Sequence, residues 1–141
     1  MRRVAFVAAL GAAFLGGLGP AAADVVAEIK LSGQTMVVSV DGVVLHVWPV
    51  STGRPGWRTP TGTFRPQSMH VRHFSTLFNG APMPYSIFFH GHFAIHGARE
   101  IKNLARRASH GCVRLHPVNA RTLFGLIRGT GSGNARIVVT S

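Results

Sequence analysis

The sequence predicts a small, mainly β domain in which mixed sheets pack face to face, with one main helix. Two runs of β-branched or aromatic residues each surround a turn dipeptide, Asp41-Gly42 in the first and Gly91-His92 in the second, which is the pattern of a β-hairpin. A later stretch, after Pro117, has apolar residues at helical spacing. A chain of 141 residues that is mostly strand with one helix is expected to form one domain around one core.

The first 23 residues have the layout of a secretory signal peptide. Arg2 and Arg3 give a positive start, residues 4–19 are apolar, and alanines at 21–23 supply an A-x-A cleavage site. A membrane anchor is the alternative, but glycines interrupt the apolar run, which is shorter than the roughly 20 residues that a span needs. We therefore expect cleavage, a mature domain at residues 24–141, no transmembrane segment after cleavage, and export to the periplasm or cell wall.

The strands of the mature domain follow from local patterns. Residues 35–50 form a hairpin with a type I′ turn at Asp41-Gly42. A further strand starts at residue 62, in "GTFRP", after a proline turn. Residues 85–97 form the second hairpin, and residues 135–141, "ARIVVTS", form a closing strand.

The helix is expected to start after Pro117 and to end at Gly129. The apolar residues at helical spacing are Ala120, Leu123, Phe124 and Ile127. We expect this stripe to face the core, not a partner protein. Between the elements, residues 68–84 are a candidate lid or substrate subsite, and Trp57 in a Gly/Pro loop is either exposed near the substrate or packed on the core.

The charge is strongly positive. Without Arg2 and Arg3, thirteen Lys and Arg residues face four acids, a formal charge of +9. A basic surface suits a polyanionic partner. For an exported protein we expect the anionic cell wall or membrane surface and not nucleic acid, with solubility alone as the alternative. We expect a monomer.

Cys112 is the only cysteine, in the stretch "ASHGCVRLHP". Exported proteins usually pair their cysteines in disulfides, so a lone one is a buried thiol, an intermolecular bridge or a nucleophile. His110 and Arg114 lie two residues to either side, and nearby cations lower the pKa of a thiol. Gly111 leaves room for a substrate carbonyl. These neighbours favour a nucleophile.

His96, at the end of the second hairpin, is the candidate general base. A base of this kind is usually oriented by a second group. None of the four acids is well placed to orient it. Asp24 and Glu28 lie at the start of the mature domain, which we expect to be mobile. Asp41 lies in a turn, and Glu100 lies in a loop, where we expect it to face solvent. We therefore expect His96 to face Cys112 with one ring nitrogen and to donate from the other to a backbone carbonyl or a hydroxyl.

These motifs together resemble a known family. "IHG" at 95–97 followed by "SHGCVRL" at 109–115 is similar to the signature of the L,D-transpeptidase (YkuD-type) catalytic domain. "VWPVSTGRPGWRTPTGTF" at 47–64 and "MPYSIFFHGHFAIHG" at 83–97 resemble its upstream segments, in the expected order. The resemblance runs from about residue 29 to the C-terminus, and it implies the family's β-sandwich-like fold for residues 24–141.

The resemblance implies catalytic roles for Cys112 as nucleophile, for His96 as general acid/base and for His110 beside the cysteine. Further candidates for contacts to substrate or oxyanion are Ser109, Gly111, Arg114, Gly97 and Tyr85. Arg114 is either a clamp for a substrate carboxylate or part of a structural ion pair. The interval from His96 to Ser109 is at the short end for the family, which leaves the shape of this loop open.

The resemblance also implies the chemistry. The cysteine would attack the L,D-amide before the terminal D-alanine of a peptidoglycan stem, form a thioester, and pass the acyl group to the side-chain amine of a neighbouring stem. Members of the family are acylated at this cysteine by carbapenems. No metal and no cofactor are expected.

Four alternatives remain from the residues alone. Hydrolysis of the thioester would make the protein an L,D-carboxypeptidase. A sortase-like transpeptidase also has histidine before cysteine in an exported β-rich domain. A zinc hydrolase could use His90, His92 and His96, although this is a weak ligand pattern. A non-catalytic protein could bind the wall through its basic face.

Overall fold

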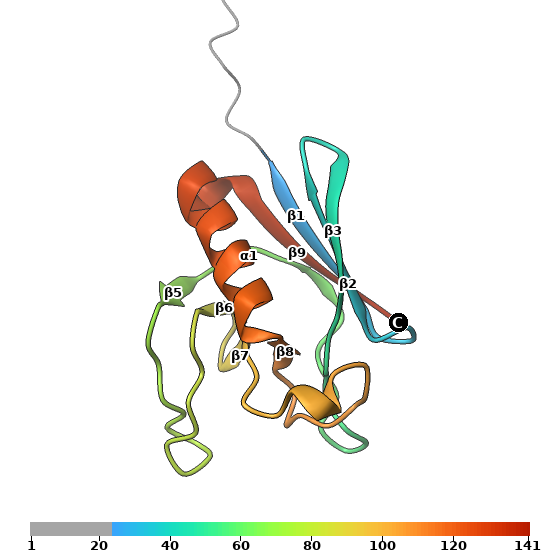
Figure 1. Cartoon of the computed structure of the whole chain (residues 1–141), viewed down its shortest axis with the longest axis vertical. Coiled ribbons are helices and arrows are strands. Elements are labelled where there is room, and N and C mark those ends of the chain that lie inside the picture. Colours follow the sequence, from blue (N-terminus) through green and yellow to red (C-terminus); the bar gives the residue numbers. More distant parts are fainter. Residues whose placement is uncertain (1–23) are drawn as a thin grey trace, which may run out of the picture.

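In the computed structural model, which describes residues 24–141, nine strands form two mixed sheets and one α-helix lies against them (Figure 1). The five-stranded sheet has the order β3-β2-β1-β9-β4, with β1 Val25–Lys30, β2 Thr35–Val40, β3 Val43–Pro49, β4 Gly62–Phe64 and β9 Ala135–Thr140. The four-stranded sheet has the order β5-β6-β7-β8, with β5 Ser68–His70, β6 Ser86–His90, β7 Phe93–Gly97 and β8 Val113–Leu115. The helices are α1 Pro117–Thr130 and two 3-10 turns, η1 Ile101–Asn103 and η2 Ser132–Asn134.

Both predicted hairpins are confirmed. β2 and β3 pair antiparallel around Asp41 and Gly42, whose φ angles of 51° and 79° are those of a type I′ turn. β6 and β7 pair antiparallel on either side of Gly91, which also has a positive φ, 57°. The strands expected in "GTFRP" and "ARIVVTS" are β4 and β9, which pair with each other.

The helix buries the predicted stripe, Ala120, Leu123, Phe124 and Ile127. It continues past Gly129, however, and ends at Thr130 because Gly131 takes the positive φ of 92° that stops it. No helix in residues 24–141 has the length and apolarity that a membrane crossing requires. The predicted signal peptide, residues 1–23, lies outside the described residues.

The expectation of a mobile start to the mature domain is wrong. β1 is the central strand of its sheet, antiparallel to β2 and parallel to β9, and it places Glu28 level with Val37 and Val138. Val25, Ala27 and Ile29 are buried. A strand buried on one side and paired on both edges is held firmly.

The two sheets and α1 enclose one hydrophobic core. α1 starts two residues after β8 and packs most closely on β7, so it supports the strand that carries His96 near its end and the strand that starts directly after Cys112. The segment 71–85 between β5 and β6 extends away from the sheets as a long loop, yellow-green in Figure 1. Its two arms meet at a bridge between Phe74 and Pro82.

Candidate active site

The parallel pairing of β7 with β8 brings the two predicted catalytic residues together. The pairs are Ile95 with Val113, His96 with Arg114 and Gly97 with Leu115. Residues at the same level of neighbouring strands point to the same face, and so do residues two apart on one strand. His96, Arg114 and Cys112 therefore share a face, and the Cys112 sulfur lies 3.8 Å from the carbonyl oxygen of His92.

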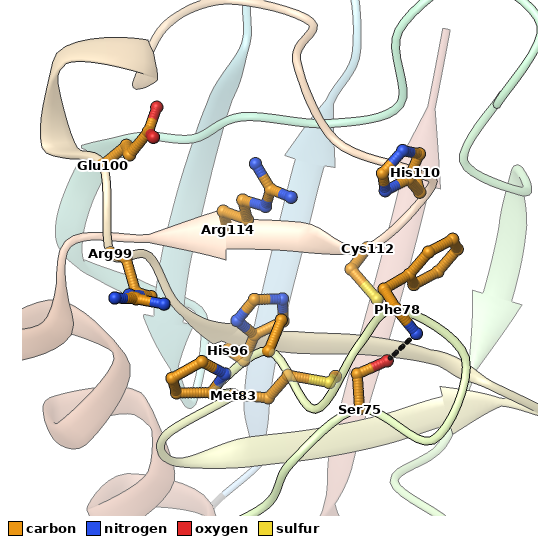
Figure 2. Close-up of a pocket in the computed structure, with 11 residues that line it drawn as sticks. Ser75, Phe78, Met83, His96, Arg99, Glu100, His110, Cys112 and Arg114 are labelled. Atoms are coloured by element: carbon orange, nitrogen blue, oxygen red, sulfur yellow. Dashed lines mark hydrogen bonds between the residues drawn. The ribbon is translucent and has the colours of Figure 1, made fainter.

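A cavity of about 200 Å³ opens on this face (Figure 2). Four predicted site residues line it: Cys112, His96, His110 and Arg114. The segment 71–85 supplies another five, Ser75, Phe78, Ala81, Pro82 and Met83, so this segment does line the cavity as expected of a lid or subsite. The remaining two, Arg99 and Glu100, were not among the predicted site residues.

His96 is oriented by a backbone carbonyl, as predicted. The residue is 7% exposed, and its Nδ1 lies 2.8 Å from the carbonyl oxygen of Gly97. A carbonyl oxygen only accepts, so Nδ1 carries the proton and Nε2 is left as the base. Burial lowers the pKa of His96 to about 4, against the opposing effect of the Gly97 hydrogen bond, and Arg114 and His73 lower it further. The ring is neutral at physiological pH.

Cys112 differs from the sequence-based expectation. Burial raises the pKa of its thiol, and this outweighs the Ala94 backbone N–H and the Arg114 guanidinium, which both lower it. The thiol pKa is therefore not depressed by its charged neighbours. In the resting site a neutral thiol lies beside a neutral imidazole. The Cys112 sulfur must therefore transfer its proton to His96 to become a nucleophile.

The turn before the cysteine is held by hydrogen bonds of Ser109, which is fully buried. Its hydroxyl accepts from the Gly111 N–H at 3.0 Å and donates to the Cys112 carbonyl at 2.6 Å. Ser109 therefore shapes the turn and does not reach a substrate. The Gly111 N–H is already engaged, so it is not the free oxyanion donor that the sequence suggested.

Gly111 is required by its surroundings. Its φ is +117°, and a Cβ there would lie 2.4 Å from Cε1 of Phe93. Its carbonyl accepts from the hydroxyl of buried Thr59 at 2.8 Å, and the same hydroxyl accepts from the Gly53 N–H at 3.0 Å. Thr59 thus ties two loops of the site together. Thr59 lies in the segment 47–64, and no pattern in the sequence indicated this role.

His110 forms a wall of the cavity. The Arg54 guanidinium donates to the Nε2 of His110 at 3.0 Å. The His110 ring stacks on Phe78, with ring centroids 4.3 Å apart, and packs edge-on against Trp57, with ring centroids 4.8 Å apart. Burial, then the charges of Arg54 and Arg114, lower the pKa of His110. Because its Nε2 accepts from Arg54 and its ring packs between two aromatic rings, His110 holds the side chains of Arg54, Trp57 and Phe78 in place. Trp57 is 43% exposed and contacts His110 instead of packing on the core; its nearness to a substrate stays a prediction.

Three other predicted residues fall in different places. Gly97 supplies the carbonyl that orients His96, and a Cβ there would lie 3.2 Å from the Pro117 Cα. Arg114 is not part of an ion pair: within residues 24–141 the one ion pair joins Lys30 to Glu28. Its guanidinium instead faces the cavity (Figure 2). Tyr85 is not in the cavity wall; its ring packs edge-on against Phe124 of α1.

Glu100 is exposed, as expected of a residue in this loop. It lines the cavity, and its Oε2 accepts from the Asn103 side chain at 2.8 Å. The histidines of the zinc alternative, His90, His92 and His96, do not converge: within residues 24–141 no three His, Cys, Asp or Glu side chains are grouped to hold a metal ion.

Comparison with known proteins gives a consistent result. The family model of the L,D-transpeptidase catalytic domain matches residues 24–139. Among curated protein sequences, none matches the chain significantly.

Solved structures of L,D-transpeptidases share this fold. One from Mycobacterium smegmatis has 26% identity, a TM-score of 0.74, and covers 84% of this chain and 59% of its own. One from Mycobacterium tuberculosis has 24% identity and a TM-score of 0.76, and the match covers 84% of this chain and 58% of the solved chain. One from Xylanimonas cellulosilytica has 26% identity, a TM-score of 0.72, and covers 86% and 63%. The chain thus spans about six tenths of the length of these solved chains.

Proposed function

The chain belongs to the L,D-transpeptidase catalytic domain family, and from that premise we propose that it is a peptidoglycan L,D-transpeptidase with Cys112 as its nucleophile. One observation carries the proposal: Cys112 shares a cavity with a neutral His96 whose tautomer is fixed by the Gly97 carbonyl. A thiol beside a base that is itself oriented by a third group is the arrangement of an activated nucleophile.

The reaction starts with proton transfer. His96 Nε2 takes the Cys112 proton as the sulfur attacks the carbonyl of the L,D-amide before the terminal D-alanine. The C–N bond breaks, His96 returns the proton to the leaving amine, and the acyl group remains on Cys112 as a thioester. Attack by an amine of a second stem then transfers the acyl group, and attack by water hydrolyses it.

The developing oxyanion needs a donor other than Gly111. The backbone N–H of Cys112 has no acceptor among residues 24–141, which makes it the better candidate. The free Arg114 guanidinium suits a substrate carboxylate near the same carbon. We further propose that the protein is exported, acts as a monomer on peptidoglycan stems in the periplasm or cell wall, and does not bind nucleic acid.

The test is incubation of the protein with a disaccharide-tetrapeptide, followed by mass spectrometry. D-alanine release that persists with a chelator and is absent in Cys112→Ala supports the proposal. Formation of a cross-linked dimer identifies a transpeptidase, whereas a tripeptide product identifies an L,D-carboxypeptidase. Release of D-alanine by Cys112→Ala would overturn the mechanism.

A further inference from the structure

The hairpin end, which we define as Val43, Val44 and Leu45, is aliphatic and open to solvent. These residues are 62%, 57% and 49% exposed. They lie on β3, which is an edge strand of its sheet and contains no Lys, Arg, Asp or Glu. Folded proteins usually protect an edge strand with charged side chains or cover it. In a chain with a formal charge of +11, an uncharged aliphatic edge is therefore expected to have a partner.

The hairpin end lies beside the point where the described chain begins. The N–H of Asp24 donates to the side chain of Asp41 in the β2–β3 turn, at 2.9 Å. The apolar residues 4–19 are joined to Asp24 through residues 20–23, which reach at most about 14 Å. A membrane that holds the apolar segment therefore lies close to the hairpin end until the segment is cleaved.

Three exposed arginines lie at the same end of the molecule. Arg136 is on β9, in the same row across the sheet as the second residue of the hairpin end. Arg128 is in the last turn of α1, which reaches the top of Figure 1 together with the β2–β3 turn. Arg65 donates to a backbone carbonyl of η2 at 2.7 Å. The two aspartates named above reduce this positive charge but do not cancel it. Arginines around exposed aliphatic side chains fit a bilayer with anionic headgroups.

The catalytic cavity lies toward the other end of β3. Ser51, eight residues after Val43, forms a bridge with Arg114 of the cavity. At about 3.3 Å per residue, the hairpin end is up to about 26 Å from this bridge. Contact of the hairpin end with a bilayer therefore leaves the cavity away from the lipid and open to other substrates.

We propose that the hairpin end is a membrane-docking site, which inserts its three aliphatic side chains into a bilayer that contains anionic lipids while the three arginines bind headgroups. The three aliphatic residues span about 7 Å along the strand, comparable to the depth of about 5–10 Å at which interfacial segments are buried. Val47 lies about 13 Å from Val43 along the strand and stays outside the bilayer. Docking does not depend on the proposed activity.

The test is cosedimentation of the protein, purified after export, with vesicles of equal parts phosphatidylglycerol and phosphatidylcholine and with vesicles of phosphatidylcholine alone. The wild-type protein is expected to bind the mixed vesicles about tenfold more tightly. Val44→Ser/Leu45→Ser should lose about tenfold in affinity for the mixed vesicles, because two aliphatic side chains no longer enter the bilayer. Arg136→Gln should lose about fivefold on the mixed vesicles and nothing on the neutral ones.

Val47→Ser is the matched control, because Val47 lies on the same strand, is 63% exposed and stays outside the bilayer. It should keep the wild-type affinity. No binding of the wild type to mixed vesicles, or an equal loss in Val47→Ser and the double variant, overturns the proposal. A wild-type dimer in sedimentation velocity that Val47→Ser dissociates also overturns it, since β3 would then pair with a second copy.

A fluorescence measurement tests which residues enter the lipid. An environment-sensitive dye is attached to Leu45→Cys or to Val47→Cys, each in Cys112→Ala protein so that the dye has one site. On mixed vesicles the emission of the dye at position 45 should shift to shorter wavelength, and that of the dye at position 47 should not. No shift at position 45 overturns the docking site. Neither measurement involves D-alanine release, so the proposed function is tested separately.

Discussion

The cavity has a floor and a cover of opposite character. The floor is β7 and β8, where Ala94 to Gly97 are buried, the strands are paired in register, and His96 and Gly111 have defined hydrogen-bond partners. The cover is the segment 71–85, which is buried at Met83 near its end but open to solvent at its tip, where Phe74 and Leu77 are each 61% exposed. Segments with few buried contacts open most easily.

The difference separates two tasks. Proton transfer requires atoms held to within a fraction of an ångström, and the floor supplies this through strand pairing and a buried turn. Admission and release of a stem peptide require movement, and the exposed cover is suited to it. Changes on the floor should therefore reduce kcat, and changes on the cover should mainly alter KM.

The largest effect is expected from the nucleophile on the floor. Cys112→Ala should abolish D-alanine release while the circular dichroism spectrum stays native, because the small side chain fits where the thiol was. A carbapenem should add one covalent adduct to the wild-type protein in an intact-mass spectrum and none to Cys112→Ala. An adduct on the variant would place the reactive group elsewhere.

Loss of the base comes next. His96→Ala should lower kcat by about 10²–10⁴-fold, the usual contribution of general acid–base catalysis. Asp41→Asn is the control: this acid lies in the β2–β3 turn, where its side chain accepts from the Asp24 N–H, and steady-state kinetics should be unchanged. A large loss of kcat in Asp41→Asn would mean that a carboxylate does act on the base.

The turn beneath the cysteine should be intolerant of a single methyl group. Gly111→Ala meets both a positive φ and the Phe93 ring, so it should shift Cys112 and cost about 10²-fold in kcat. Gly125→Ala on α1, where a Cβ would contact nothing, should keep full activity and raise the melting temperature slightly. Comparable kcat values for the two variants would show that the turn is not rigid.

The buried histidine should make stability fall in acid. The pKa of His96 is about 4 in the folded protein and near 6.5 when unfolded. Between these values the unfolded chain takes the proton and the folded one does not, so stability falls as pH drops from about 6.5 to about 4. The loss between pH 7 and pH 5 should be about 2 kcal/mol in urea unfolding. In His96→Gln this part of the pH dependence should disappear; an unchanged slope would contradict the burial of the ring.

The cover should give the smallest effect. Phe78→Ala removes the ring that stacks on His110 and should raise KM about tenfold while kcat changes little. Phe74→Ala is the matched control, since Phe74 lies on the same segment, is exposed and does not line the cavity. If Phe78→Ala lowered kcat as much as Gly111→Ala does, the division between floor and cover would be wrong.

Elements whose causes are local were predictable from the amino-acid sequence. The Asp41-Gly42 turn, the second hairpin and the buried stripe of α1 each depend on residues a few positions apart, so pattern and turn chemistry were enough to predict them. The end of α1 was missed by one residue because two glycines, Gly129 and Gly131, can each stop a helix and only the second takes a positive φ. Cys112 and His96 were predicted from their motif, and the backbone carbonyl that orients His96 from the poor placement of the acids.

Which groups meet, and how deeply they are buried, depends on the packing of segments that are distant in the chain. β1 is central because it pairs with β9, which lies more than 100 residues away in the chain. Local sequence patterns do not predict pairing over such a distance. Burial reversed the expected direction of the Cys112 pKa, and packing against Phe124 kept Tyr85 out of the cavity wall. These outcomes depend on desolvation and on strand register, both of which arise when distant segments pack together, so the order of residues along the chain does not specify them position by position.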